Sequence, residues 1–365
     1  MKILIVSPSL RMGGSERVIS LLTQELSKNN QIWLALFNSH DIAFPYKAEL
    51  IDLSCPARSN YLGKFSNFIK RIIRLQQLIK TYQPDLIISF MESANFPTII
   101  ASLLAGTLSK TEISVHSNPK FFSVPQKLFI SITYPLPKRV IAVSQGIANA
   151  LRYYHIPKNK IVHIPNPISL EQILLLSKQE PPLFSNVPPN YILGVGRLHV
   201  SKGFDQLIKA FSKLRDQSLH LILLGSGEEK NNLLQLVQEL EIIDRVHFLN
   251  SVENPFPFYR KAICFILSSH YEGFPLVLLE ALACECPVIS YDCDYGPSEL
   301  IQDGVNGMLI KNGDVESLVN AIEQLIEDSS LRKTFRSNSL NSVYQYDIQS
   351  IAKRYINMFY NHKYR

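Results

Sequence analysis

The chain has 365 residues, of which 46% are apolar and 19% charged, and this composition excludes a disordered or fibrous protein. Its five cysteines lack the spacing of a disulfide framework, which favours a reducing compartment. Residues 1–170 hold nineteen Lys and Arg against eight Asp and Glu, whereas residues 171–365 hold eighteen against twenty-three. We therefore expect the first half to face something anionic, such as nucleic acid, a phosphorylated substrate or a lipid surface.

The N-terminal sequence, MKILIVSPSLRMGG, contains one apolar run of four residues from Ile3 to Val6. This run is shorter than the core of a signal peptide and far shorter than a membrane span, so we expect a cytoplasmic protein. The run predicts the first strand, and a helical pattern that begins near Ser15 follows it.

Apolar runs alternate with helical patterns along the chain, and strands that are apolar throughout are typical of a parallel sheet covered on both faces. In the first half, strands are expected at 3–6, 32–37, 85–90, 112–116, 139–144 and 160–165, with helices from 15 and over 64–80 and 95–108. In the second half, strands are expected at 191–196, 220–225, 246–249, 262–269, 287–292 and 308–310, with helices over 203–214, 228–240, 314–328 and 347–361 and one beginning near 275.

A proline-rich stretch divides the two series. Residues 171–190 carry four prolines in two pairs and predict a linker. We therefore predict an α/β protein of two doubly wound domains, residues 1–170 and 191–345, that face a cleft. The last helix, within 346–365, is expected to cross back to the first domain.

Glycines and charges follow several predicted strands, where ligands bind in open α/β sheets. Gly13 and Gly14 precede a helix N-terminus, and their backbone N–H groups could approach an anion; a simple capped loop is the alternative. Arg197 and Lys202 lie in the glycine-flanked loop GVGRLHVSKG. Two cations at a strand end could hold a diphosphate, although they could also be solvated loop charges.

The stretch HYEGFPLVLLEALACECPVIS, residues 270–290, places Glu280 alone in an apolar segment. Pro275 suits the first turn of a helix, so Glu272 falls in the preceding loop and Glu280 inside the helix. A buried carboxylate needs hydrogen-bond donors, and no Lys or Arg between 262 and 310 can serve as a local partner. Ribose hydroxyls are suitable donors, and Glu272 with the two backbone amides after it could hold a second hydroxylated group.

His116 follows a predicted strand in the sequence ISVHSNP and precedes Ser117 and Asn118. A lone His is most often structural, and a polar role in an active site is the alternative. Cys284, Cys286 and Cys293 lack zinc-ligand spacing and are interpreted as core residues. No metal site is expected, since Asp-Cys-Asp at 292–294 is better explained as loop polarity.

The motifs GGSERV, GRLHVSKG, LGSGE, EGFPLVLLEALACECPVI, GPSELI and DGVNGMLI occur in this order along the chain. Together they resemble the retaining, nucleotide-sugar-dependent glycosyltransferases of family 4, which have the GT-B fold of two Rossmann-like domains. The motifs SVHSNP and YGPSEL resemble most those of bacterial enzymes that extend lipid-linked glycans, polysaccharides or O-antigens.

The resemblance implies a role for each matching residue. Arg197 and Lys202 would bind the donor diphosphate, and Glu280 its ribose. Glu272 and His116 would contact the transferred sugar, and the first glycine loop would lie over the phosphates. The implied catalytic residues are His116, Arg197, Lys202 and Glu272, and the implied donor-binding residues are Gly13, Gly14, Gly273, Phe274, Pro275, Leu276 and Glu280.

The implied reaction moves a hexose or N-acetylhexosamine from a nucleoside-diphosphate sugar, UDP before GDP, to a glycan or polyprenyl-linked acceptor, without a metal or other cofactor. Cations would stabilise the leaving diphosphate, and front-face attack would retain the anomeric configuration. A sugar-nucleotide epimerase of the same fold would form product without an acceptor. An NAD-dependent oxidoreductase would need the third glycine that GVGRLH lacks, and a nucleic-acid-binding protein would leave Glu280 unexplained.

Two segments of the basic half, 64–80 and 119–139, mix basic with apolar and aromatic residues and contain no acid. They could seat the first domain on an anionic membrane, which would make the protein peripheral on the inner face of the plasma membrane. The alternative is packed helices with a solvated basic face. No nucleic-acid partner is expected.

Overall fold

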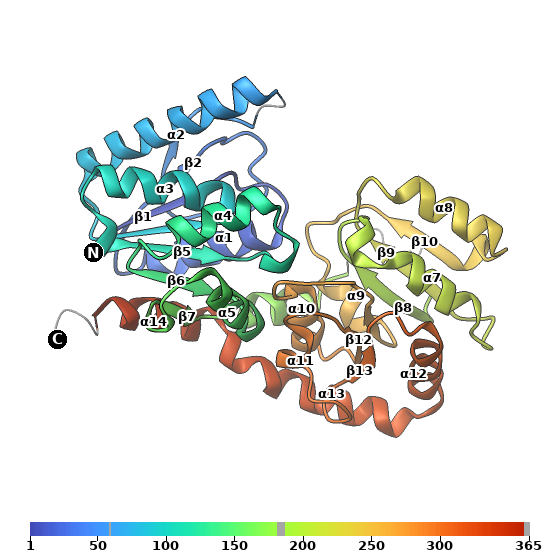
Figure 1. Cartoon of the computed structure of the whole chain (residues 1–365). Coiled ribbons are helices and arrows are strands. Elements are labelled where there is room, and N and C mark those ends of the chain that lie inside the picture. Colours follow the sequence, from blue (N-terminus) through green and yellow to red (C-terminus); the bar gives the residue numbers. More distant parts are fainter. Residues whose placement is uncertain (58–59, 181–186, 361–365) are drawn as a thin grey trace. The chain divides into compact units, whose positions relative to one another are not determined.

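The computed structural model describes residues 1–57, 60–180 and 187–360. The chain forms two compact units (Figure 1), of which the first comprises Met1–Pro167 and Ile348–Arg365 and the second Ile168–Asp347. Each unit is built on one parallel sheet with helices on its faces, which confirms the predicted α/β fold of two doubly wound domains. Among the described residues, no helix has the length and apolar character that a membrane span requires.

The first unit has a seven-stranded sheet in the order β3-β2-β1-β4-β5-β6-β7. The strand order reverses between β1 and β4, the place where ligands bind in open α/β sheets. The register puts Phe90 beside Ser114, so the residues that follow β4 and β5 emerge next to each other. The strands are β1 (Lys2–Ser7), β2 (Gln31–Leu36), β3 (Glu49–Asp52), β4 (Leu86–Phe90), β5 (Thr111–Val115), β6 (Arg139–Ala142) and β7 (Ile161–His163).

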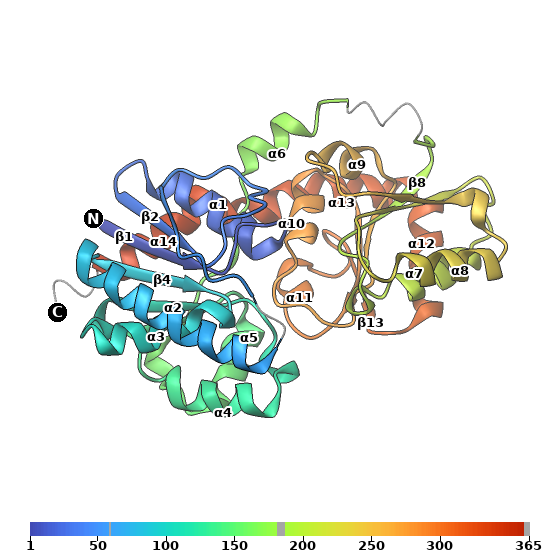
Figure 2. The same ribbon diagram turned by 90° about the horizontal axis from the view of Figure 1, so that it is seen from above.

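The helices of the first unit cover both faces of its sheet. Figure 2 shows α1 and α14 on one face and α2 and α3 on the other, and α14 contacts α1 although the two are far apart in sequence. The helices are α1 (Gly14–Leu26), α2 (Tyr61–Tyr82), α3 (Glu92–Leu104), α4 (Val124–Thr133), α5 (Gln145–Leu151) and α14 (Ile348–Tyr360).

The second unit has a six-stranded sheet in the order β10-β9-β8-β11-β12-β13. Its strands are β8 (Tyr191–Val195), β9 (His220–Leu224), β10 (Val246–Leu249), β11 (Phe265–Leu267), β12 (Val288–Asp292) and β13 (Met308–Lys311). Its helices are α6 (Leu170–Leu176), α7 (Phe204–Ser212), α8 (Lys230–Glu239), α9 (Phe256–Lys261), α10 (Leu276–Ala283), α11 (Pro297–Leu300), α12 (Val315–Glu327) and α13 (Ser329–Val343).

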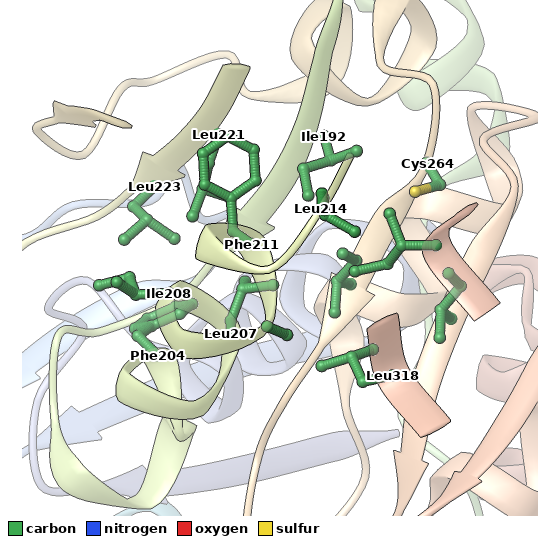
Figure 3. Packing of buried hydrophobic residues seen from close by; sticks show 14 of the residues in the cluster. Ile192, Phe204, Leu207, Ile208, Phe211, Leu214, Leu221, Leu223, Cys264 and Leu318 are labelled. Atoms are coloured by element: carbon green, nitrogen blue, oxygen red, sulfur yellow. The ribbon is translucent and has the colours of Figure 1, made fainter. Parts of the chain in front are cut away.

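The core of the second unit follows from the apolar pattern of α7. Its residues Phe204, Leu207 and Phe211 recur at helical spacing and are buried against Ile192 of β8 and Leu221 of β9. Figure 3 shows this cluster between the helix and the sheet. The core fixes the strand ends from which the loops of the candidate site emerge.

Helix α13 was not predicted from the sequence. Its sequence, SSLRKTFRSNSLNSV, is rich in serine and has a narrow buried stripe formed by Phe335, Ser339 and Val343. The helix begins where the Asp328 side chain accepts a hydrogen bond from the backbone N–H of Leu331 at 2.9 Å. A stripe this narrow gives a weak helical signal, so tertiary packing and the cap define the helix.

The predicted linker at 171–190 was wrong for its first part. Helix α6 occupies Leu170–Leu176 and belongs to the second unit, which begins at Ile168 rather than at 191. Ser169 caps this helix by accepting from the N–H of Gln172, and Leu170 and Ile173 are buried. The proline pair at 181 and 182 lies outside the described residues.

Candidate functional site

Glycines allow three loops of the second unit to pack backbone against backbone. Gly203 has φ +59°, and a Cβ there would lie 2.1 Å from the carbonyl oxygen of Ser268. A Cβ at Gly225 would lie 1.9 Å from the carbonyl oxygen of Gly196. Only glycine permits such an approach, so the loops after β8, β9 and β11 form one rigid layer at the carboxyl ends of their strands.

This layer brings together Lys202 and Glu272, which are far apart in sequence. The Lys202 Nζ lies 2.6 Å from Glu272 Oε1, and the Ser269 hydroxyl donates to the same oxygen at 2.7 Å. The Ser268 hydroxyl donates to the Lys202 carbonyl oxygen at 2.9 Å and so fixes the backbone of Lys202. Arg197 follows β8 in the same loop, and its side chain is exposed. The site thus presents two cations and one carboxylate.

Glu280 is buried, with 3% of its surface exposed, and lies inside α10. The Tyr259 hydroxyl of α9 donates a hydrogen bond to Glu280 Oε2 at 3.3 Å. This donor was not predicted from the sequence, because Tyr259 lies before residues 262–310 and is a phenol rather than a cation. A contact between Glu280 and a ribose stays a prediction.

The turn before α10 packs against a second motif. Gly296 has φ +103°, and a Cβ there would lie 2.4 Å from the Pro275 Cδ atom. Phe274 contacts the ring of Tyr346 at a centroid distance of 5.7 Å. The segments EGFP and YGPSEL therefore support each other, and Gly273 and Leu276 flank the buried Phe274 and Pro275 in this turn.

In the first unit, His116 follows β5 and is half-buried. Its Nε2 lies 3.0 Å from the Ser114 hydroxyl, and its ring contacts that of Phe90 at a centroid distance of 5.6 Å. Burial lowers the pKa of His116 to about 3, so the ring is neutral near pH 7. Its Nδ1 is buried and has no protein hydrogen-bond partner. A neutral ring with this free nitrogen can hydrogen-bond a hydroxyl group.

Glu92, which follows β4 and begins α3, was not predicted as a site residue from the sequence. Ser117 donates to Glu92 Oε2 at 3.2 Å, and Oε1 is buried without a hydrogen-bond partner. Burial raises the pKa of Glu92. Met91 has φ +69°, a strained conformation of the kind that clusters at functional sites. The signal for Glu92 in the sequence was an acidic residue closely following the strand predicted at 85–90.

In the first unit, the glycine pair lies beside an acidic side chain. The Glu16 carboxylate lies over Gly13, where an added Cβ would be 2.4 Å from Glu16 Oε2. Burial raises the pKa of Glu16. Gly13 has extended backbone, with φ −176°, and so the glycine gives room to this carboxylate. Phosphate binding by Gly13 and Gly14 stays a prediction.

Cys284, Cys286 and Cys293 are all buried free thiols, in agreement with their interpretation as core residues. Burial raises the pKa of Cys286 to about 12, so that thiol is protonated near pH 7.

Comparison with known proteins defines the class. The model of the glycosyltransferase family 4 domain matches residues 12–172, and that of glycosyl transferases group 1 matches residues 177–342. The fold and these matches define a glycosyltransferase of the GT-B type.

Individual relatives agree over nearly the whole chain. An N-acetylgalactosaminyltransferase of Campylobacter jejuni, which acts on a diphospho-undecaprenol-linked N-acetylgalactosamine-N,N'-diacetylbacillosamine, is 29% identical over 94% of this chain and 95% of its own. The lipopolysaccharide 1,6-galactosyltransferase of Escherichia coli is 26% identical over 97% of this chain and 100% of its own. The structure of Anabaena HepE in complex with UDP superposes with a TM-score of 0.81 at 23% identity, over 99% of this chain and 100% of HepE. The chain belongs to glycosyltransferase family 4.

Proposed function

We propose that the enzyme transfers a hexose or N-acetylhexosamine, with retention of configuration, from a UDP-sugar to a glycan or polyprenyl-linked acceptor. The observation that carries the proposal is the Lys202–Glu272 pair, which backbone-packed glycine loops hold together; Arg197 lies in the same loop as Lys202. The UDP in the HepE structure supports the donor, and the undecaprenol-linked acceptor of the Campylobacter enzyme supports the acceptor class.

The second unit supplies the groups that recognise the donor. Arg197 and Lys202 neutralise the diphosphate and stabilise the negative charge that develops as it leaves. Glu272, oriented by Lys202 and Ser269, accepts hydrogen bonds from the transferred sugar. Glu280 accepts from the ribose. Because two side-chain cations serve the diphosphate, the proposed reaction needs no metal or other cofactor.

The first unit supplies polar groups for sugar hydroxyls. His116 offers its Nδ1, and Glu92 offers its buried Oε1. In the proposed front-face reaction, the oxygen of the acceptor hydroxyl bonds to the anomeric carbon as the bond from that carbon to the phosphate oxygen breaks. The departing phosphate oxygen takes the proton of the acceptor hydroxyl. The first-unit groups orient these hydroxyls and form no covalent bond. A polyprenyl-linked acceptor would place the enzyme at the inner face of the plasma membrane.

Calorimetric titration with UDP, GDP, ADP and NADH tests the proposal. We expect saturable binding of UDP that Lys202→Ala weakens, and weaker or no binding of the other three ligands. Saturable binding of NADH alone would return the oxidoreductase interpretation. Conversion of a UDP-sugar to a different UDP-sugar without an acceptor would instead establish an epimerase.

A further inference from the structure

Two neighbouring helices of the first unit expose rows of large apolar side chains. Helix α2 exposes Tyr61 (90%), Leu62 (85%) and Phe65 (68%) at its start, and helix α4 exposes Val124 (80%), Leu128 (63%) and Ile132 (60%). The α4 residues recur four apart, and on α2 Phe65 lies four residues after Tyr61 and three after Leu62, so the members of each row lie on one side of their helix. We call these six side chains the apolar face. Monomeric proteins rarely expose large apolar groups together unless the surface binds a partner.

The two rows belong to adjoining helices. The ring of Phe129, on α4, contacts that of Phe68, on α2, at a centroid distance of 6.3 Å and that of Phe96, on α3, at 4.8 Å. Figures 1 and 2 both show α3 alongside α2 and α4 on the same side of the sheet. The aromatic contacts anchor the two helices while their outer rows stay in solvent.

The structure separates residues that serve the fold from residues available to a partner. In α2, Ile72 and Leu75 are buried core residues. Arg71 donates to the Cys55 carbonyl oxygen at 2.8 Å and stacks on Phe37, and Arg74 donates to the Leu53 carbonyl oxygen. These two arginines hold a loop, so the basic stripe of α2 is partly structural.

The charges around the apolar face favour an anionic partner. No Asp or Glu occurs between 53 and 84 or between 113 and 170, the stretches that contain α2 and α4. Lys64 and Lys70 of α2 are exposed, and Lys127 lies next to Leu128 on α4. A second copy of the chain would bring two such positive surfaces together, whereas anionic lipid headgroups attract lysine and acyl chains accept the apolar side chains.

We propose that the apolar face inserts into the surface of an anionic lipid bilayer. This proposal rests on the proposed function in one respect, since membrane insertion would bring the enzyme to a lipid-linked acceptor. Because apolar insertion is not screened by salt, binding should fall less between about 0.05 and 0.5 M NaCl than purely electrostatic adsorption would.

Flotation of the purified protein with vesicles tests this proposal. We expect the protein to float with vesicles that contain about a third phosphatidylglycerol and to bind pure phosphatidylcholine vesicles more weakly. The variant Leu128→Glu/Ile132→Glu should bind at least about tenfold more weakly. The control Leu175→Glu/Ile243→Glu adds the same charge at residues of the second unit that are 65% and 46% exposed, and it should bind within about twofold of the native protein.

Three results would overturn the proposal. The first is a native protein that stays unbound with phosphatidylglycerol vesicles at low salt. The second is a Leu128→Glu/Ile132→Glu variant that floats as well as the native protein. The third is a native protein that is a dimer without lipid while this variant is a monomer. UDP titration of the same samples reports folding and the donor site independently. Vesicle binding without UDP binding would contradict the proposed function and leave the apolar face as a lipid-docking surface.

Discussion

Replacing Glu280 by Gln separates a structural role of this buried side chain from a role in donor binding. The amide has nearly the same volume and keeps an acceptor oxygen for the Tyr259 hydroxyl, which lies 3.3 Å from Glu280 Oε2. The free energy of unfolding should therefore change by no more than about 1 kcal/mol. A ribose hydroxyl would lose a charged acceptor, worth about 1.5–3 kcal/mol, which corresponds to an affinity for UDP about ten- to a hundredfold weaker.

Tyr259→Phe is the matched variant, because it removes the Tyr259 hydroxyl and leaves the carboxylate of Glu280 in place. We expect a loss of about 1–3 kcal/mol in stability and a change in UDP affinity of no more than about threefold. Urea unfolding measures the stability of both variants, and calorimetric titration measures UDP binding. If Glu280→Gln binds UDP as tightly as the native enzyme, Glu280 is a structural partner of Tyr259 and the assignment to ribose is refuted.

Gly203→Ala should lose about 2–4 kcal/mol of stability in urea unfolding, because φ is positive and the new Cβ meets the Ser268 carbonyl group. The control Gly304→Ala, where φ is positive but the space around the new Cβ is open, should lose only about 1–2 kcal/mol. Equal losses of stability in the two variants would refute the steric argument. Burial lowers the pKa of His116 to about 3, so between about pH 7 and pH 5 the unfolded chain binds a proton that the folded ring does not. The free energy of unfolding should therefore fall by about 2 kcal/mol over this range. His116→Gln should flatten this dependence on pH, and an unchanged slope would contradict a neutral, buried His116. Glu92→Gln should lower the turnover of sugar transfer at least about tenfold while UDP affinity is unchanged, and native turnover would exclude a role for Glu92 in transfer.

Most of the fold was predictable because its signals are local. Strands such as Leu86–Phe90 are apolar throughout, and helices such as Phe204–Ser212 have a wide apolar face. Elements with weak local signals were missed, including the short edge strand Glu49–Asp52 and the serine-rich helix Ser329–Val343. Packing and capping determine these elements, and neither can be read from a short window of sequence.

The site was predictable where a motif is contiguous. The loop of Arg197 and Lys202 and the segment of Glu272 each contain their own glycines, so each pointed to a ligand by itself. The hydrogen bonds between motifs were not predictable, because Tyr259 reaches Glu280 only through the packing of α9 on α10. Glu92 was missed for the same reason, since the neighbouring strands β4 and β5 bring it to Ser117 and His116.

Titration of UDP into the native enzyme, Lys202→Ala and Lys209→Ala tests the central claim most directly, because donor binding at the glycine loops depends on the Lys202 charge. Lys209 is the control: its side chain is 49% exposed and pairs with Asp205 on the surface of α7. The account predicts that Lys202→Ala weakens UDP binding about ten- to a hundredfold and that Lys209→Ala changes it by less than about twofold. Equal affinity of all three proteins for UDP, or no binding of UDP by the native enzyme, would contradict it.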